Sequence, residues 1–177
     1  SQGHSFMSDI AQEIPLELRD ISREPRVKPK NAPRKVTHTI TLVPAGYVNS
    51  LWFEVRDFLG PAVARTKGRW NMEYLHAAIL NEHQHLWLAF DQDNKIDGVG
   101  TTEFVDYPCK RMLAIQFLGG SNFNSWVWDM VDRFNGWATD NYCDGIEATA
   151  RSGFWKWLEQ DGYTRSFTVF EKRLNDG

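Results

Sequence analysis

Cysteine is scarce in this sequence: Cys109 and Cys143 are the only two in 177 residues. So few cysteines provide no disulfide framework and suit a reducing compartment, and we expect both to be free thiols. Long apolar runs are also missing, since none approaches the roughly 20 residues that a membrane-spanning helix requires. The formal net charge is only −3, so no field of one sign attracts nucleic acid or an anionic membrane. These absences favour a cytoplasmic protein without a membrane partner.

Apolar and aromatic residues, in contrast, are plentiful. A hydrophobic fraction of 42% and eight tryptophans predict a folded globular protein, and the length suits one domain. Residues 1–6, SQGHSF, resemble a vector remnant that precedes Met7. Residues 7–35 are polar and punctuated by prolines, which predicts an extended arm. The packed domain is expected over residues 36–177.

The arm carries several lysines and arginines, which allows a second interpretation, a basic arm that binds nucleic acid or a partner. Glu13, Glu17, Asp20 and Glu24 dilute that charge. We therefore expect a solvated leader that drapes over the domain, and nucleic acid is not the partner that the composition favours.

Hydrophobic periodicity predicts the elements of the domain. Val36, His38, Ile40 and Leu42 alternate with threonines, as in a half-buried strand. The helix that follows is expected to stop at Gly60-Pro61. The whole pattern reads β-α-α-β-β-β-α-β-α-β, an α/β (α+β) order. The expected ranges are 35–43, 45–60, 71–82, 85–91, 96–106, 110–118, 123–137, 145–150, 152–162 and 163–174.

The junction between the strand 110–118 and the helix 123–137 has an unusual composition, Gly119-Gly120-Ser121-Asn122. Glycines let the backbone approach a diphosphate closely, and the N-terminus of a helix offers oriented N–H groups and a partial positive charge. The same residues also suit a tight turn. Ser121 or Asn122 is expected to cap the helix when no ligand is bound.

This junction and the element order resemble the GNAT acetyltransferase family. The family's pyrophosphate loop, Q/R-x-x-G-x-G/A, fits the run Gln116-Phe117-Leu118-Gly119-Gly120-Ser121 except at its last position, where Ser121 replaces glycine or alanine. The C-terminal run is similar to the family's final helix and strand: Gly162-Tyr163 matches Gly-Phe, and Arg151 falls at an asparagine position. This tail looks most like small GNAT proteins of phages and prophages.

The resemblance implies a mostly antiparallel mixed sheet of about six to seven strands with helices on both faces. It also implies acetyl-CoA as cosubstrate, with its pantetheine arm against the strand edge at Ile115 and Phe117, and its pyrophosphate at the glycine junction. The residues expected to bind the cofactor are Ile115, Gln116, Phe117, Leu118, Gly119, Gly120, Ser121, Asn122 and Arg151.

The catalytic residues are less clearly marked. The tyrosine that many family members use to protonate the thiolate falls at Leu158 here, by counting back from Gly162. Tyr142 is the substitute we predict, with Tyr163 and Cys143 as alternatives. For the base that deprotonates the amine we predict Glu103, with Asp106 and Glu147 as alternatives. A carboxylate can act as this base where its surroundings raise its pKa.

The sequence thus favours an N-acetyltransferase that moves an acetyl group from CoA directly to a primary amine, on a small molecule or a protein. The departures at Leu158 and Ser121 favour an alternative, a GNAT fold that has lost catalysis and serves as a binding or virion-associated protein. A homodimer is expected, since family members often dimerise. No metal site is expected, because His83 and His85 lack partner ligands.

Overall fold

The structure is a computed structural model that describes residues 19–20, 34–150 and 152–175. Residues 1–6, most of the predicted arm and Arg151 lie outside the described residues. One six-stranded sheet has the order β1-β2-β3-β4-β5-β6, in which β1 to β5 are antiparallel neighbours and β5 and β6 are parallel. Its strands are β1 (Arg19–Asp20), β2 (Thr39–Val43), β3 (His85–Phe90), β4 (Ile96–Tyr107), β5 (Lys110–Gly120) and β6 (Gly145–Ala148).

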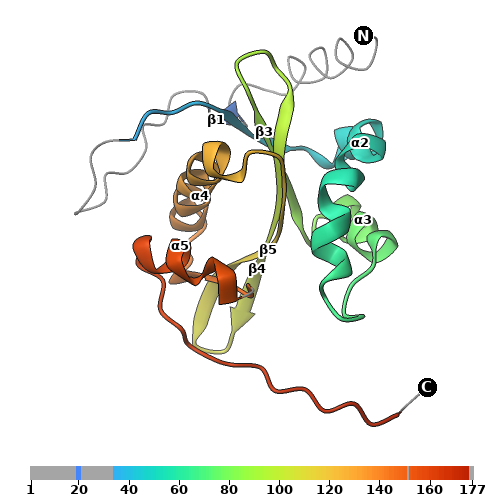
Figure 1. Ribbon diagram of the computed structural model, residues 1–177, viewed down its shortest axis with the longest axis vertical. Coiled ribbons are helices and arrows are strands. Elements are labelled where there is room, and N and C mark those ends of the chain that lie inside the picture. Colours follow the sequence, from blue (N-terminus) through green and yellow to red (C-terminus); the bar gives the residue numbers. More distant parts are fainter. Residues whose placement is uncertain (1–18, 21–33, 151, 176–177) are drawn as a thin grey trace.

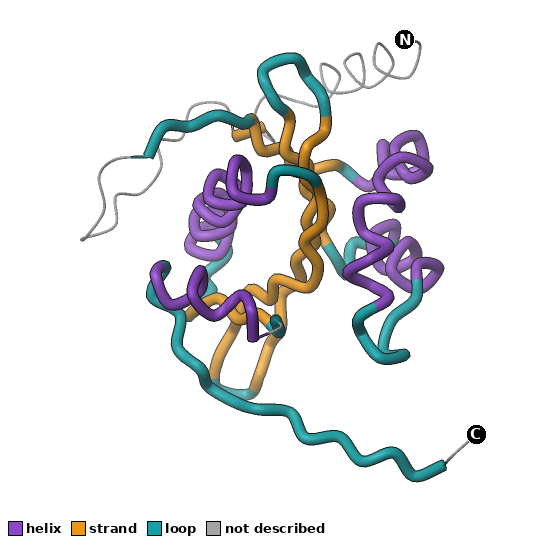
Figure 2. Tube along the Cα trace, in the orientation of Figure 1, coloured by secondary structure: helices purple, strands orange, loops and turns teal. Residues whose placement is uncertain are grey.

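Helices cover both faces of the sheet, as Figures 1 and 2 show. On one face, α2 (Ala45–Ala64) and α3 (Met72–Leu80) enclose a core that includes Leu51, Val99 and Phe117. On the other face, α4 (Phe123–Asp140), the turn η2 (Ser152–Phe154) and α5 (Trp155–Gln160) follow. There Trp126, Phe134 and Ile115 belong to a second core. The predicted α+β class and mostly antiparallel sheet are confirmed.

A β-bulge at Gln116 changes the side of the sheet to which β5 directs its side chains. Thr101 pairs with Phe117 and Thr102 with Ile115, so Gln116 is an extra residue. Ile115 therefore packs against α4 although Phe117, two residues later, packs on the α2–α3 side. Regular alternation would have placed both on one face.

Helix α2 does not stop at Gly60-Pro61 as predicted but continues to Ala64 with Pro61 inside it. Pro61 has no amide N–H and removes one bond of the helix ladder. The added turn, however, buries Val63 in the first core with 4% of its surface exposed. Burial of this side chain offsets the lost hydrogen bond.

The final predicted strand, over 163–174, is absent from the sheet: these residues are extended but join no strand. Figure 1 shows the segment leaving α5 and running away from the sheet. Its alternating apolar residues supplied the strand signal, yet Phe167 and Phe170 are 92% and 91% exposed. Periodicity shows only that a segment can pair, so the expectation of a strand over 163–174 was wrong. No helix in the described ranges is long and apolar enough to cross a bilayer.

Candidate active site

Strands β5 and β6 separate halfway along β5. They pair only from Met112–Gly145 to Ile115–Ala148, although β5 continues to Gly120. Residues 116–120 therefore keep one edge bonded to β4 and leave the other edge without a strand partner in the described sheet. An edge of this kind can bind an extended ligand through backbone hydrogen bonds.

The register identifies which backbone groups face this edge. The Ser121 N–H donates to the Asp97 carbonyl, with 3.0 Å between N and O. This bond lies beside the paired residues Gly98 and Gly120, so these two are not hydrogen-bonded to each other. In an antiparallel ladder, the members of such a pair direct their own N–H and C=O groups away from each other. Gly120 and, two residues earlier, Leu118 thus present their backbone groups to the open edge, while those of Phe117 point toward β4.

Both glycines of the junction lie within β5, where close packing requires them. A Cβ atom on Gly119 would lie 2.0 Å from the carbonyl oxygen of Phe58 in α2. A Cβ atom on Gly120, where φ is +150°, would lie 2.2 Å from the Asp97 carbonyl oxygen. The glycine pair is therefore explained by packing against neighbouring backbone, and the turn itself consists of Ser121 and Asn122.

Helix α4 begins at this turn without a side-chain cap. Asn122 is the N-cap residue with φ of 52°, and neither it nor Ser121 forms the side-chain cap that the sequence predicted. The left-handed conformation of Asn122 directs the chain into the helix, and its carbonyl instead accepts from the N–H and hydroxyl of Ser125. No acidic residue occupies the first turn. A hollow of about 400 Å³, lined by residues 122–125, lies at this positive end of the helix.

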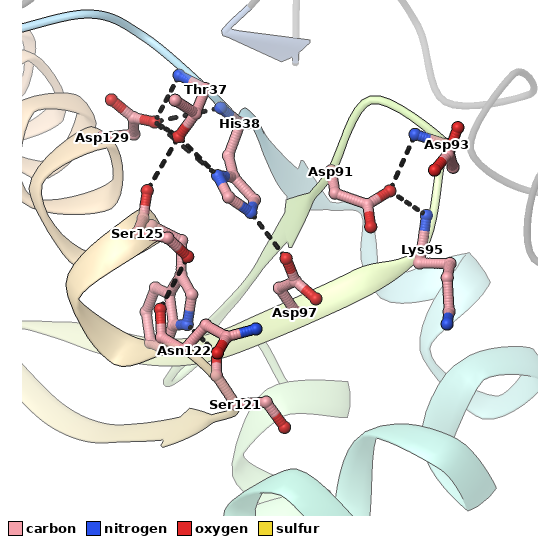
Figure 3. Close-up of polar contacts among 11 residues, drawn as sticks. Thr37, His38, Asp91, Asp93, Lys95, Asp97, Ser121, Asn122, Ser125 and Asp129 are labelled. Carbon is pink, nitrogen blue, oxygen red and sulfur yellow. Dashed lines mark hydrogen bonds and ion pairs between the residues drawn. The ribbon is translucent and has the colours of Figure 1, made fainter.

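A buried polar network holds the first strand against α4 beside this turn, as Figure 3 shows. The carboxylate of Asp129 in α4 accepts hydrogen bonds from the backbone N–H groups of Thr37 and His38, at 3.1 and 3.0 Å, and pairs with Arg34. The Nε2 atom of His38 lies 2.7 Å from an oxygen of Asp97, whose carbonyl holds Ser121. His38 is 7% exposed and is thus a buried residue whose ring nitrogen has a polar partner.

Two carboxylates flank Ala114 in a single row across the sheet. Ala114 pairs with Glu103 on β4 and with Glu147 on β6. Phe104 and Ile146, which are adjacent to Glu103 and Glu147 in their strands, pack on the α4 side. Both glutamates therefore face the opposite side of the sheet. Neighbouring strands are about 4.8 Å apart, which places the two backbones about 10 Å from each other. The row lies at the level where β5 and β6 begin to separate.

Each glutamate of this row accepts a hydrogen bond from a neighbour. Gln116 donates its side-chain amide to Glu103, with 2.6 Å between Nε2 and Oε1. The phenol of Tyr107 donates to Glu147 at 2.8 Å. That bond, followed by partial burial and the charges of Glu147 and Glu103, raises the pKa of Tyr107. The phenol therefore stays protonated at neutral pH, beside two carboxylates.

The structure brings some of the predicted site residues together and separates others. Glu103 and Gln116 are in contact, and residues 116–122 line the open edge and the α4 turn, whereas Ile115 forms the last pair with β6. Tyr142 is 89% exposed. It precedes Gly145, which pairs with Met112, so it lies at the end of the β5–β6 pair opposite to the point where the two strands separate. Asp106 is bonded to Arg111, near the β4–β5 hairpin. Arg151 lies outside the described residues.

Tyrosine 163, an alternative proton donor from the sequence, has a buried hydroxyl without a hydrogen-bond partner in the described part of the chain. Burial, followed by the charge of Asp161, raises its pKa. Cys143 is half-buried beside the second core, and Leu158 is half-buried in α5. Among the described residues no group of three histidine, cysteine or acidic side chains suits a metal ion.

Sequence reasoning missed Tyr107 and the network of Asp97 and Asp129. No motif marks Tyr107 or the two aspartates. The row of Glu103 and Glu147 became recognisable only once the register of three strands was known. The bulge at Gln116 left no sequence signal either, except that residues 115 and 117 are both apolar.

Solved structures resemble this fold across most of their length. An aminoglycoside acetyltransferase from an uncultured soil metagenomic sample, solved with sisomicin, has a TM-score of 0.58 at 15% identity, covering 78% of this chain and 97% of that one. A predicted acetyltransferase from Clostridium acetobutylicum, solved with acetyl-CoA, has a TM-score of 0.57 at 16% identity, covering 77% of this chain and 96% of that one. A ribosomal-protein-alanine N-acetyltransferase from Brucella melitensis biovar Abortus 2308 gives 0.57 at 11%, covering 76% and 99%.

No protein-family model matches the sequence, and no curated protein matches it. The similarity to solved structures nevertheless defines the architecture. The chain has the fold of the GNAT acetyltransferases, with a mixed sheet and helices on both faces.

Proposed function

We propose that the protein is an acetyl-CoA-dependent N-acetyltransferase that transfers the acetyl group directly to a primary amine. One observation carries the proposal: β5 extends beyond its last pair with β6, and its open edge leads from the Glu103–Glu147 row to the uncapped start of α4. An extended pantetheine arm fits a strand edge, and a diphosphate fits a helix N-terminus without acidic residues.

The residues along this edge suggest how acetyl-CoA would bind. The backbone groups of Leu118 and Gly120 would pair with the amides of the pantetheine arm. The N–H groups of Phe123 and Asn124, which have no acceptor in the described part of the chain, would face the pyrophosphate. Ser121, Asn122 and the hollow at residues 122–125 would complete that end. This assignment keeps the binding region that the sequence predicted and moves its pantetheine contacts from Ile115 and Phe117 to Leu118 and Gly120.

The transfer itself requires a base for the amine and a proton for the departing thiolate. The amine nitrogen would attack the thioester carbonyl carbon, forming a C–N bond as the C–S bond breaks. Glu103, held by Gln116, would accept the proton from the amine. We assign the proton for the thiolate to the phenol of Tyr107 in preference to Tyr142, because Tyr107 shares a face with Glu103.

Calorimetric titration with acetyl-CoA, and separately with CoA, tests the binding step. Micromolar binding supports the proposed edge and turn, whereas no binding at millimolar ligand contradicts the proposal. Release of free thiol in the presence of a panel of primary amines then tests transfer.

A second candidate function is a GNAT-fold binding protein, virion-associated or otherwise, without catalysis. The leucine at position 158, where many family members have the catalytic tyrosine, favours it. CoA binding without thiol release for any amine in the panel would favour this candidate over the enzyme.

A further inference from the structure

The two glutamates that flank Ala114 carry negative charges that the described part of the chain does not neutralise. Glu103 accepts from the amide of Gln116, and Glu147 accepts from the phenol of Tyr107; neither partner is a cation. Among the described residues, no lysine, arginine or histidine forms an ion pair with either carboxylate. Both glutamates are half-buried, so water screens their charges only in part. The row therefore attracts a cation from outside the chain.

A buried amide without a hydrogen-bond partner lies next to Glu103. His85 pairs with Thr102, and the same register continued by one residue places Gln84 beside Glu103. Leu86 packs on the α2–α3 side, and alternation directs Gln84 to that side as well, where Glu103 also points. Gln84 is 1% exposed, and neither its amide nitrogen nor its amide oxygen has a partner in the part of the chain that the structure describes. A buried amide of this kind is costly unless a partner from outside the chain satisfies it.

Thr101 adds a second unsatisfied polar group to the same face. It lies two residues before Glu103 on β4, so both side chains point to the α2–α3 side. Its hydroxyl is buried and has no hydrogen-bond partner among the described residues. Thr101 pairs with Phe117, whose ring meets the ring of Trp70 edge-on, with 5.9 Å between centroids. Hydrogen-bond acceptors and apolar rings thus lie together at one end of the row, as an aliphatic amine requires.

We propose that the amine acceptor is a short aliphatic diamine or polyamine, with its reacting nitrogen at Glu103 and a second, charged ammonium group at Glu147. This inference rests on the proposed function and specifies its substrate class. The backbones of β4 and β6 are about 10 Å apart, so a single ammonium group beside Glu103 leaves Glu147 unpaired. Two ammonium groups joined by a short carbon chain pair with both carboxylates. Ala114, between them, has a small side chain that leaves room for the carbon chain.

The diamine would supply what each group of the row lacks. The reacting nitrogen gives its proton to Glu103, and the oxygens of Gln84 and Thr101 offer acceptors for its N–H groups. The second nitrogen stays protonated and pairs with Glu147. The carboxylate of Glu147 has two oxygens and can accept from this ammonium group and from Tyr107 together. A monoamine leaves Glu147 without a cation, so the row predicts a preference for a second positive charge.

A metal ion is the other cation that two carboxylates can bind. Magnesium and calcium require six or more oxygen ligands, which a protein site supplies mainly from carboxylates and carbonyls. In the described ranges, no third histidine, cysteine or acidic side chain joins Glu103 and Glu147 to form such a group. The row therefore suits an organic cation better than a metal ion.

Calorimetric titration of the full chain with 1,4-diaminobutane and, separately, with butylamine tests the site, both alone and with CoA present. We expect the diamine to bind roughly tenfold or more tightly than the monoamine, because only the diamine forms the second charge-assisted hydrogen bond. Glu147→Gln keeps an oxygen that accepts from Tyr107 but removes the charge, and it should bring the two affinities close together. Asp106→Asn is the matched control, since Asp106 is exposed and bonded to Arg111, and it should preserve the difference.

Release of free thiol from acetyl-CoA then compares the same two amines. We expect a higher kcat/KM for the diamine and a fall of this ratio in the Glu147→Gln variant. The two amines differ in basicity, but this difference is the same for both proteins and cannot produce the fall. Likewise, a loss of catalysis common to both amines cancels in the ratio.

The outcomes separate this inference from the proposed function. Equal kcat/KM for the two amines would overturn the diamine assignment and leave the acetyltransferase standing. Tighter binding of the diamine without thiol release would support the site and contradict the proposed function. Equal affinities with and without CoA, or a difference that Glu147→Gln does not reduce, would overturn the assignment to this row.

Discussion

Gln116 donates a hydrogen bond to Glu103 across the β4–β5 pair, with 2.6 Å between the amide nitrogen and the carboxylate oxygen. Gln116 is the extra residue of the bulge in β5, and Glu103 pairs with Ala114 just before it. The bond orients a carboxylate at the level where β5 and β6 separate. The residue of the bulge that borders the open edge is thus bonded to the predicted base.

Replacing Glu103 by glutamine should remove the base and leave the fold and the CoA site intact. If a reactive amine is found, we expect turnover to fall by roughly 10²–10⁴-fold with CoA affinity unchanged. Thiol release and calorimetry measure the two quantities. Asp106→Asn is the matched control, since Asp106 is exposed and bonded to Arg111 instead. Full turnover by the Glu103 variant would remove this assignment.

Asn124→Asp places a negative charge in the first turn of α4 without touching the core. An acidic residue at this end of a helix stabilises the helix by about 0.3–1 kcal/mol, yet it repels a diphosphate bound there. We therefore expect an unchanged or slightly raised melting temperature together with a roughly tenfold or greater loss of CoA affinity.

Ser50→Asp is the control for that change, because Ser50 is exposed on α2, which covers the other face of the sheet, and it adds the same charge. Equal affinities for CoA in the Asn124 variant, the Ser50 variant and the unaltered chain would place the pyrophosphate elsewhere. Substitutions at Gly119 or Gly120 are less informative, since their Cβ atoms would collide with backbone and disturb folding as well as binding.

Asp129→Ala should destabilise the domain through the network that joins β2 to α4. The carboxylate is 3% exposed and accepts from two backbone N–H groups while pairing with Arg34. Its removal leaves these donors unsatisfied, and we expect a loss of about 2–4 kcal/mol in the free energy of unfolding. Urea denaturation measures it, with Asp140→Ala at the exposed end of α4 as control. Equal losses in the two variants would contradict the role of the network.

Local patterns in the sequence were sufficient to predict most of the fold. The predicted break between the strands 85–91 and 96–106 is a turn in which Asp91 accepts from two backbone N–H groups, and the helix predicted from residue 71 has Asn71 as its cap, accepting from Tyr74. The helix at Phe123 was predicted from apolar spacing and begins at that residue. Signals of this kind act within a few residues and need no tertiary partner.

The rest of the site depended on contacts between distant residues. The glycine pair was interpreted as a phosphate loop, but the carbonyls of Phe58 and Asp97, brought close by folding, account for it. Glu103 and Glu147 face each other across Ala114 only because β4, β5 and β6 adopt one register. The apolar alternation of residues 163–174 predicted a strand, but these residues join no strand of the described sheet, because periodicity within a segment does not specify a pairing partner.

His85 should make the stability of the domain depend on pH. Burial, outweighing a hydrogen bond with Thr102, lowers the pKa of this imidazole to about 4 from the ordinary 6.5. Its ring packs against Phe104 and Trp137, with centroids 4.8 and 5.7 Å away, which leaves little room for water around a charge. Between these pH values the unfolded chain binds the proton more readily, so stability falls as pH decreases from about 6.5 to about 4.

The contribution of His85 to this loss amounts to about 3 kcal/mol at most, and it disappears above pH 6.5. We expect His85→Gln, which can still bond to Thr102, to have a flatter curve of unfolding free energy against pH over this interval. Carboxylates that titrate in this pH interval affect the unaltered protein and the His85 variant equally, so their contribution cancels when the two curves are subtracted. His83→Gln, at an exposed neighbouring position, should follow the unaltered chain. Parallel curves for the unaltered chain and the His85 variant would show that the imidazole is charged in the folded protein.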